Sequence, residues 1–151
     1  MRHIVRPLAL MKNTVAFHIA VHEVRQSDAR YAPHAYAFLC DALDHAVKLL
    51  ARDDAEDRHV TGQELLAGFR DLALREFGPM ALFVMHEWGI KTSEDVGRMV
   101  YNFIEIGFFG RNDTDSLNDF SDGVNMAEAL RAPYLLKAKA GAAPDDLKTQ
   151  N

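Results

Sequence analysis

The 151-residue chain has one cysteine, one tryptophan and no long run of apolar residues. A single cysteine cannot form an internal disulfide, so the fold must be stabilised by packing, and a reducing, cytoplasmic setting is expected. Cys40 follows Phe38 and Leu39 in an apolar stretch. This position predicts a buried, unreactive thiol rather than a nucleophile.

The N-terminus begins basic and turns apolar, but it lacks the uninterrupted apolar stretch of an export or membrane signal. Its longest early apolar run is Leu8 to Met11, bounded by Pro7 and Lys12. A secretory signal needs about 7–15 such residues and a membrane-spanning helix about 18 or more. We therefore expect a soluble, unexported protein without a membrane partner.

The chain also lacks an excess of positive charge and the signature motifs of catalysis. Its 17 Lys and Arg against 22 Asp and Glu give a net charge of −5, whereas a nucleic-acid coat protein needs a basic surface. It contains no P-loop, no dinucleotide-binding glycine loop after a strand, no C-x-x-C and no G-x-S-x-G. No motif therefore favours an enzyme, and no cofactor is expected.

Clear helix boundaries are present between residues 59 and 110. They consist of a capping box, a Gly-Pro stop and start, a glycine stop and a second cap, at Thr61–Glu64, Gly78–Pro79, Gly89 and Thr92–Ser93. These signals predict helices at about 62–77, 79–88 and 94–106. Because the connections are very short, the three helices must fold onto one another.

Apolar stripes at helical spacing predict two earlier helices, at about 13–26 and 33–51, and a short one that includes 126–130. The expected fold is therefore mainly α: a compact single-domain bundle of about five helices over residues 1–136, with short irregular or 3-10 elements towards the C-terminus. Residues 137–151 lack apolar anchors, which predicts a disordered tail.

Two details of the expected helices bear on packing. Gly68 lies in the middle of the helix at 62–77, where glycine costs up to about 1 kcal/mol relative to alanine, and this predicts close packing against a neighbour. The helix at 79–88 is apolar nearly all round, so it is expected in the middle of the fold. Its apolar surface could be covered within the domain or partly by a second copy, and the sequence leaves the oligomeric state open.

Histidines provide the first candidate site. His18 and His22 stand at i and i+4 on one helix face, a spacing that suits a zinc site. A third ligand would have to come from elsewhere in the fold, so we expect no metal and interpret the two as histidines on a solvated face. Asp41 and His45 share the same spacing and are expected to form an ordinary surface pair. A metal-dependent or hydrolytic enzyme is kept as an alternative.

A helix-turn-helix is the second candidate. The helices at 79–88 and 94–106 have the connection that this motif needs. The expected exposed positions of the second helix carry three carboxylates against one arginine, which repel phosphate; the positions are Glu94, Asp95, Arg98, Asn102 and Glu105. A nucleic-acid-binding regulator of this type is therefore retained only as an alternative.

Several short motifs in order resemble a small uncharacterised bacterial family described mainly from planctomycetes and verrucomicrobia. The motifs include Asp28-Ala-Arg-Tyr31, His59-Val-Thr-Gly-Gln-Glu-Leu65 and Trp88-Gly-Ile90, followed by Asp115-Ser116 and Asp119-Phe120. The resemblance spans residues 13 to 134. It implies no activity, cofactor or partner, because the family has none established.

Most of these motif residues have an evident structural role as core, capping or turn residues. Five polar or amphipathic residues are not explained in this way and are candidates for a binding surface: Arg30, Tyr31, His59, Gln63 and Asn102. The competing interpretation is structural, with Arg30 bridging to a carboxylate and Tyr31 packing at the domain edge. The sequence predicts a non-enzymatic cytoplasmic adaptor that binds a protein partner through a helical surface.

Overall fold

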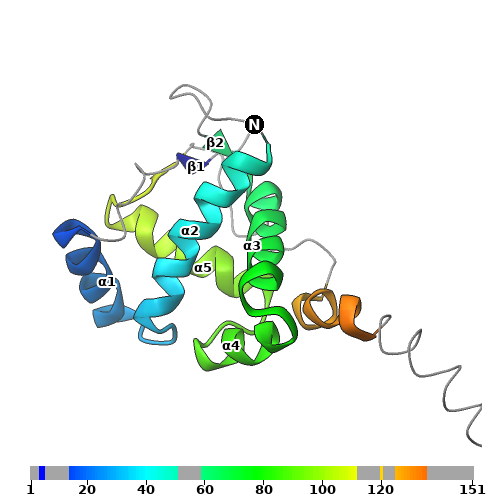
Figure 1. Cartoon of the computed structure of the whole chain (residues 1–151). Coiled ribbons are helices and arrows are strands. Elements are labelled where there is room, and N and C mark those ends of the chain that lie inside the picture. Colours follow the sequence, from blue (N-terminus) through cyan, green and yellow to red (C-terminus); the bar gives the residue numbers. More distant parts are fainter. Residues whose placement is uncertain (1–3, 6–13, 51–58, 112–119, 121–124, 136–151) are drawn as a thin grey trace, which may run out of the picture.

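The computed structural model describes residues 4–5, 14–50, 59–111, 120 and 125–135, and in this part of the chain the fold is mainly α, as the sequence predicts (Figure 1). The helices are α1 (Val15–Ser27), α2 (Pro33–Leu49), α3 (Gly62–Phe77), the 3-10 helix η3 (Gly78–Met80), α4 (Ala81–Glu87), α5 (Ser93–Glu105) and a helix over 126–135. The tail predicted at 137–151 lies outside the described residues.

The capping signals are confirmed at both predicted positions. The hydroxyl of Thr61 accepts a hydrogen bond from the Glu64 amide at 3.1 Å, and the Glu64 carboxylate accepts one from the Thr61 amide at 2.8 Å. Thr92 and Asp95 form the same reciprocal pair at the start of α5. Each box satisfies amides that have no partner within the helix, which fixes where α3 and α5 begin.

The core lies where α2, α3 and α5 meet. α5 is the most deeply buried of them, and the apolar residues that it contributes are Val96, Met99, Val100, Phe103 and Ile104. The close packing predicted at Gly68 is confirmed, because a Cβ atom added there would lie 2.7 Å from the Cβ of Ala46 on α2. The backbones of α2 and α3 therefore approach each other as only a glycine permits.

A small sheet joins three distant parts of the chain. The strands β1 (Ile4–Val5), β2 (His59–Val60) and β3 (Gly110–Arg111) pair antiparallel in the order β2-β1-β3. Ile4 is opposite Val60 on one side and Arg111 on the other. Strands of two residues carry no period-two pattern, which is why the sequence did not reveal them.

The expectation that the helix at 79–88 lies in the middle of the fold is wrong. The segment forms η3 and the short α4, which lies at the edge of the molecule (Figure 1). Within α4 only Ala81 and Met85 are buried, while Met80 and Phe83 are 54% and 58% exposed. Ala81 and Met85 are spaced i and i+4, so the fully buried residues of the seven-residue helix α4 lie on one narrow face. Leu82 and Val84 are half-buried against the core, whereas Met80 and Phe83 face outwards.

Candidate functional site

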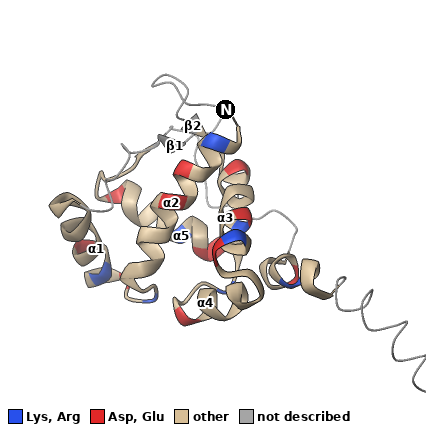
Figure 2. Cartoon of the chain, in the orientation of Figure 1, with Lys and Arg blue, Asp and Glu red and all other residues tan. Residues whose placement is uncertain are grey.

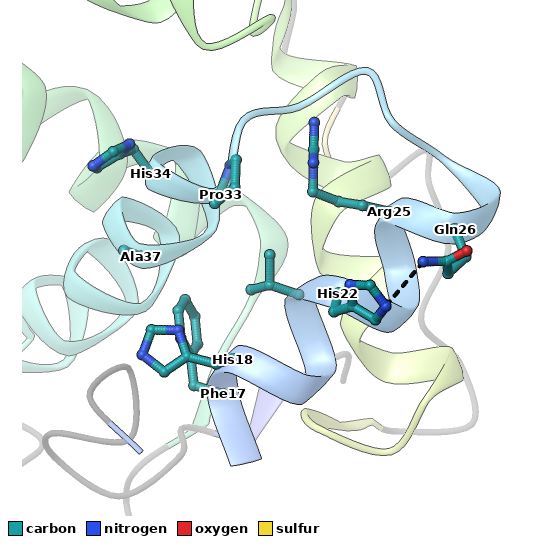
Figure 3. Close-up of a pocket in the computed structure, with 9 residues that line it drawn as sticks. Phe17, His18, His22, Arg25, Gln26, Pro33, His34 and Ala37 are labelled. Atoms are coloured by element: carbon teal, nitrogen blue, oxygen red, sulfur yellow. Dashed lines mark hydrogen bonds between the residues drawn. The ribbon is translucent and has the colours of Figure 1, made fainter. Parts of the chain in front are cut away.

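An open groove of about 710 Å³ lies between α1 and α2, which diverge from the turn that joins them (Figures 1 and 3). Its lining comes from one side of α1 and the first turns of α2: Phe17, His18, Val21, His22, Arg25, Gln26, Pro33, His34 and Ala37. This volume is within the range of sites that bind small molecules or peptide side chains.

The groove has an apolar floor and a polar rim. Phe17 and Val21 are buried at the base of α1, and Ala37 of α2 is half-buried opposite them. The rim consists of three imidazoles, one guanidinium and one amide, from His18, His22, His34, Arg25 and Gln26. None of the described residues that line the groove is acidic, although the whole chain carries a net charge of −5.

Four rim side chains make contacts that restrict their positions. Arg25 donates a hydrogen bond from Nε to the carbonyl oxygen of Tyr31 at 3.0 Å, a contact that does not use its terminal Nη atoms. The Nε2 atoms of His22 and Gln26 are hydrogen-bonded at 3.0 Å (Figure 3). The ring of His34 stacks on Trp88, with 6.5 Å between the centroids.

The three histidines of the groove do not form a metal site. Within the described ranges, no group of three or more His, Cys, Asp or Glu side chains is arranged to hold a metal ion. His18 and His22 share a face, as the sequence indicated, but that face looks into the groove rather than towards a third ligand. His45 lies elsewhere, with its Nε2 2.7 Å from the carboxylate of Asp71 on α3. The structure thus joins His45 to a neighbouring helix, a contact that the expected surface pair with Asp41 did not anticipate.

Beside the groove, the turn between α1 and α2 is joined to α5 by a polar cluster that we call the latch. It comprises Asp28, Arg30, Tyr31, Tyr36, Asp95, Arg98 and Asn102. At one end, the carboxylate of Asp28 accepts two hydrogen bonds of 2.8 Å from Arg30 and one of 3.1 Å from Asn102. The same amide nitrogen of Asn102 lies 2.9 Å from the hydroxyl of Tyr36.

Asp95 forms the other end of the latch. Its Oδ1 accepts a hydrogen bond of 2.5 Å from the Tyr31 hydroxyl and one of 2.9 Å from Arg98. Its Oδ2 accepts from the backbone amides of Lys91 and Thr92 at 2.8 and 3.0 Å. One carboxylate therefore both caps α5 and anchors the turn before α2.

The latch accounts for three of the five binding candidates. Arg30 is paired with Asp28, Tyr31 is wholly buried, and Asn102 bridges two latch residues. A side chain with no exposed surface cannot contact a partner, so the structural interpretation of Tyr31 holds. Gln63 is exposed on α3, which does not line the groove, and only the backbone of His59 lies within the described structure. Neither Arg25 nor His34 is among the binding candidates that the sequence gives, because only folding brings α1 and α2 together.

The geometry argues against a helix-turn-helix. The second helix of the motif must be exposed to enter the major groove, but only Glu105 of α5 is exposed, and Asp95, expected at its surface, is 9% exposed. A nucleic-acid interface also needs basic side chains gathered on one face of the molecule. Arg30 and Arg75 instead pair with Asp28 and Asp71, and Figure 2 shows basic and acidic residues interspersed over the described helices.

The latch carboxylates are held in their charged form. The Arg30 guanidinium keeps the pKa of Asp28 well below its usual range, against the opposing effect of burial and with the help of Asn102. Burial acts to raise the pKa of Asp95, but the hydrogen bonds from Tyr31 and from two backbone amides together lower it below its usual value. Charged Asp28 and Asp95 therefore stabilise the fold.

This arrangement predicts a loss of stability in acid. A carboxyl whose folded pKa lies below its unfolded value of about 3.9 stabilises the protein fully above that pH and progressively less below it. Asp28→Asn should lower the free energy of unfolding at pH 7 by about 1–2 kcal/mol, a modest value because Arg30 is exposed to solvent. In urea titrations, the difference in the free energy of unfolding between the variant and the wild type should be smaller at pH 3 than at pH 7. An equal difference at both pH values would contradict the role of the Asp28 charge.

None of the helices in the described part of the chain has the length and apolar content needed to cross a membrane. No protein-family model, curated protein or solved structure matches the chain. The family resemblance seen in the sequence therefore stays a prediction, and the groove has to be interpreted from its own geometry.

Proposed function

We propose that the protein is a non-enzymatic binding module that works in the cytoplasm and holds a protein partner in the groove between α1 and α2. The observation that carries this proposal is the composition of the groove, an apolar floor within a rim of polar side chains. Such a combination offers apolar area for affinity and directed groups for orientation. The single buried cysteine is consistent with a reducing compartment.

The surface around the groove supports a partner larger than a metabolite. Val15 and Ile19 on α1 are 73% and 59% exposed. Val15 is three residues before His18, and Ile19 is three residues before His22, so each lies beside a rim histidine on the helix surface. Apolar surface thus continues past the rim, and contiguous exposed apolar surface is typical of protein-interaction sites.

Filling the groove should weaken partner binding strongly without unfolding the protein. Ala37→Trp places an indole over the apolar floor from the half-buried α2 position. Tagged wild-type and variant proteins would be incubated with nuclease-treated lysate of the native host, and the bound proteins quantified by mass spectrometry. We expect at least one stoichiometric protein with the wild type and a loss of about tenfold or more with the variant, the effect of removing one well-placed contact region.

Ala67→Trp is the matched control, because it makes the same change at an exposed position of α3 away from the groove. It should capture the partner as the wild type does, and circular dichroism should show that both variants are folded. Equal capture by the folded Ala37→Trp protein would refute the groove as the binding site.

A further inference from the structure

The charges of the groove rim narrow the chemistry of its partner. Arg25 is half-buried, and its guanidinium is oriented by the carbonyl of Tyr31 through Nε alone. A guanidinium held in this way presents its Nη atoms as donors that match the geometry of a carboxylate. The imidazoles of the rim add hydrogen-bonding groups. No acidic side chain among the described lining residues competes for these groups.

Arg25 follows Val21 by about one helical turn and Phe17 by about two on the lining side of α1, so an anionic group and an apolar group can be recognised by neighbouring parts of the groove. The lining residues of α1 run from 17 to 26, which corresponds to about 14 Å along the helix axis. That length accommodates about four residues of an extended chain or two to three helical turns. The groove therefore matches a short stretch of peptide.

Building on the proposed function, we propose that the groove binds an acidic, amphipathic peptide segment of the partner, with an aspartate or glutamate on Arg25 and a neighbouring apolar side chain on Phe17 and Val21. Charge complementarity selects this occupant over a basic segment. Nucleic acid fits less well, because phosphate binding draws on many cations and the rim contributes one arginine.

Selection from a random 12-residue peptide library provides the test. The library would be displayed and selected in parallel against full-length wild type and Ala37→Trp, and peptides that depend on the open groove would be sequenced and synthesised. We expect enrichment of Asp or Glu within one helical turn of Leu or Phe. Replacing that acid by its amide should weaken binding by about tenfold in fluorescence anisotropy, the effect of losing one charge-assisted hydrogen-bonded pair.

Variants of the protein test whether the acidic side chain of the peptide contacts Arg25. Arg25→Gln should lower the affinity for the selected peptides by about the same tenfold and should bind their acid and amide forms equally well. Arg25→Lys should keep part of the preference for the acid form. Arg75→Gln on α3 is the matched control, since Arg75 pairs with Asp71 outside the groove, and it should bind as the wild type does. Melting temperatures of all variants would confirm that they are folded.

The outcomes separate this inference from the proposed function. Peptides that require the open groove but bind equally well as acid and amide would overturn the acidic specificity and leave the proposed function standing. If no peptide depends on the open groove, both are overturned. A random single-stranded RNA pool would be selected in parallel. If RNA yields binders that depend on the open groove and the peptides yield none, the protein partner and the acidic peptide are both overturned in favour of a nucleic-acid ligand.

Discussion

Replacing Gly89 by alanine is expected to destabilise the protein by about 4 kcal/mol or more, close to the total stability of many domains of this size. Gly89 has φ +91°, and a side chain in that region costs about 1–2 kcal/mol. The larger part of the effect is steric. An added Cβ atom would lie 2.1 Å from the carbonyl oxygen of Arg30, far inside van der Waals contact.

The clash falls on a junction that the fold cannot easily relax. Trp88 accepts a backbone hydrogen bond of 3.1 Å from Ala32, which ties the turn after α4 to the turn before α2. Moving Gly89 away from Arg30 would break this bond and displace Tyr31, whose hydroxyl is held by Asp95. Strain at one glycine is therefore expected to spread into the latch.

Gly107→Ala is the control that separates the two causes. Gly107 also has a positive φ, +81°, but an added Cβ atom there has nothing within 4 Å. It should lose only the conformational part, about 1–2 kcal/mol. Urea unfolding of the two variants measures the difference, and soluble expression with a helical circular dichroism spectrum reports whether Gly89→Ala folds at all. Equal destabilisation of both would show that the approach of Arg30 is not tight.

Asp95→Ala should give the second large effect, a loss of about 2–5 kcal/mol in the free energy of unfolding. The substitution removes the acceptor of two backbone amides at the start of α5 and leaves the hydroxyl of Tyr31, which is wholly buried, without its partner. A buried donor that loses its acceptor costs about 1–3 kcal/mol, and a lost helix cap about 0.5–2 kcal/mol.

The double variant of Asp95→Ala with Tyr31→Phe identifies how much of this loss comes from the stranded hydroxyl. Because Phe has no donor to satisfy, the double variant should be less destabilised than the sum of the two single variants. Glu94→Ala removes a carboxylate from the same first turn of α5 and should cost only a few tenths of a kcal/mol, as expected for the helix dipole alone. Additive single effects would show that Tyr31 and Asp95 are not coupled.

How far the sequence anticipates the structure depends on the range of the interactions involved. Helix boundaries are determined locally, so the boxes at Thr61 and Thr92 and the stop at Gly78 could be located from a few neighbouring residues. Gly68 could be recognised as a close-packing position because glycine in a helix is unfavourable unless a neighbour requires it. The burial of α4 could not be inferred from the sequence. An apolar sequence shows how much apolar surface a helix has, but it does not show how much of that surface the rest of the fold covers.

The candidate site depends on long-range placement. The spacing of His18 and His22 shows that they share a face, but not that α2 brings His34 to the same groove. Arg30, Tyr31 and Asn102 stood out in the sequence as residues without a local role. Arg30 bonds Asp28 only two positions away, but Tyr31 and Asn102 bond across 64 and 74 positions, to Asp95 and Asp28, and a local pattern cannot show these two contacts.

The divergence of α1 from α2 means that one wall of the groove is attached less securely than the other. α1 rests on α5 through contacts such as those of Phe17 with Phe103 and with Phe108, at 6.1 and 6.0 Å between ring centroids. If α1 undocks as a local unit, the groove ceases to exist in that fraction of molecules, and the apparent affinity for any occupant falls by the same fraction. Ala20 is buried on α1 outside the groove lining, so a substitution there that favours undocking would weaken binding at a distance, and an occupant would slow the hydrogen exchange of α1.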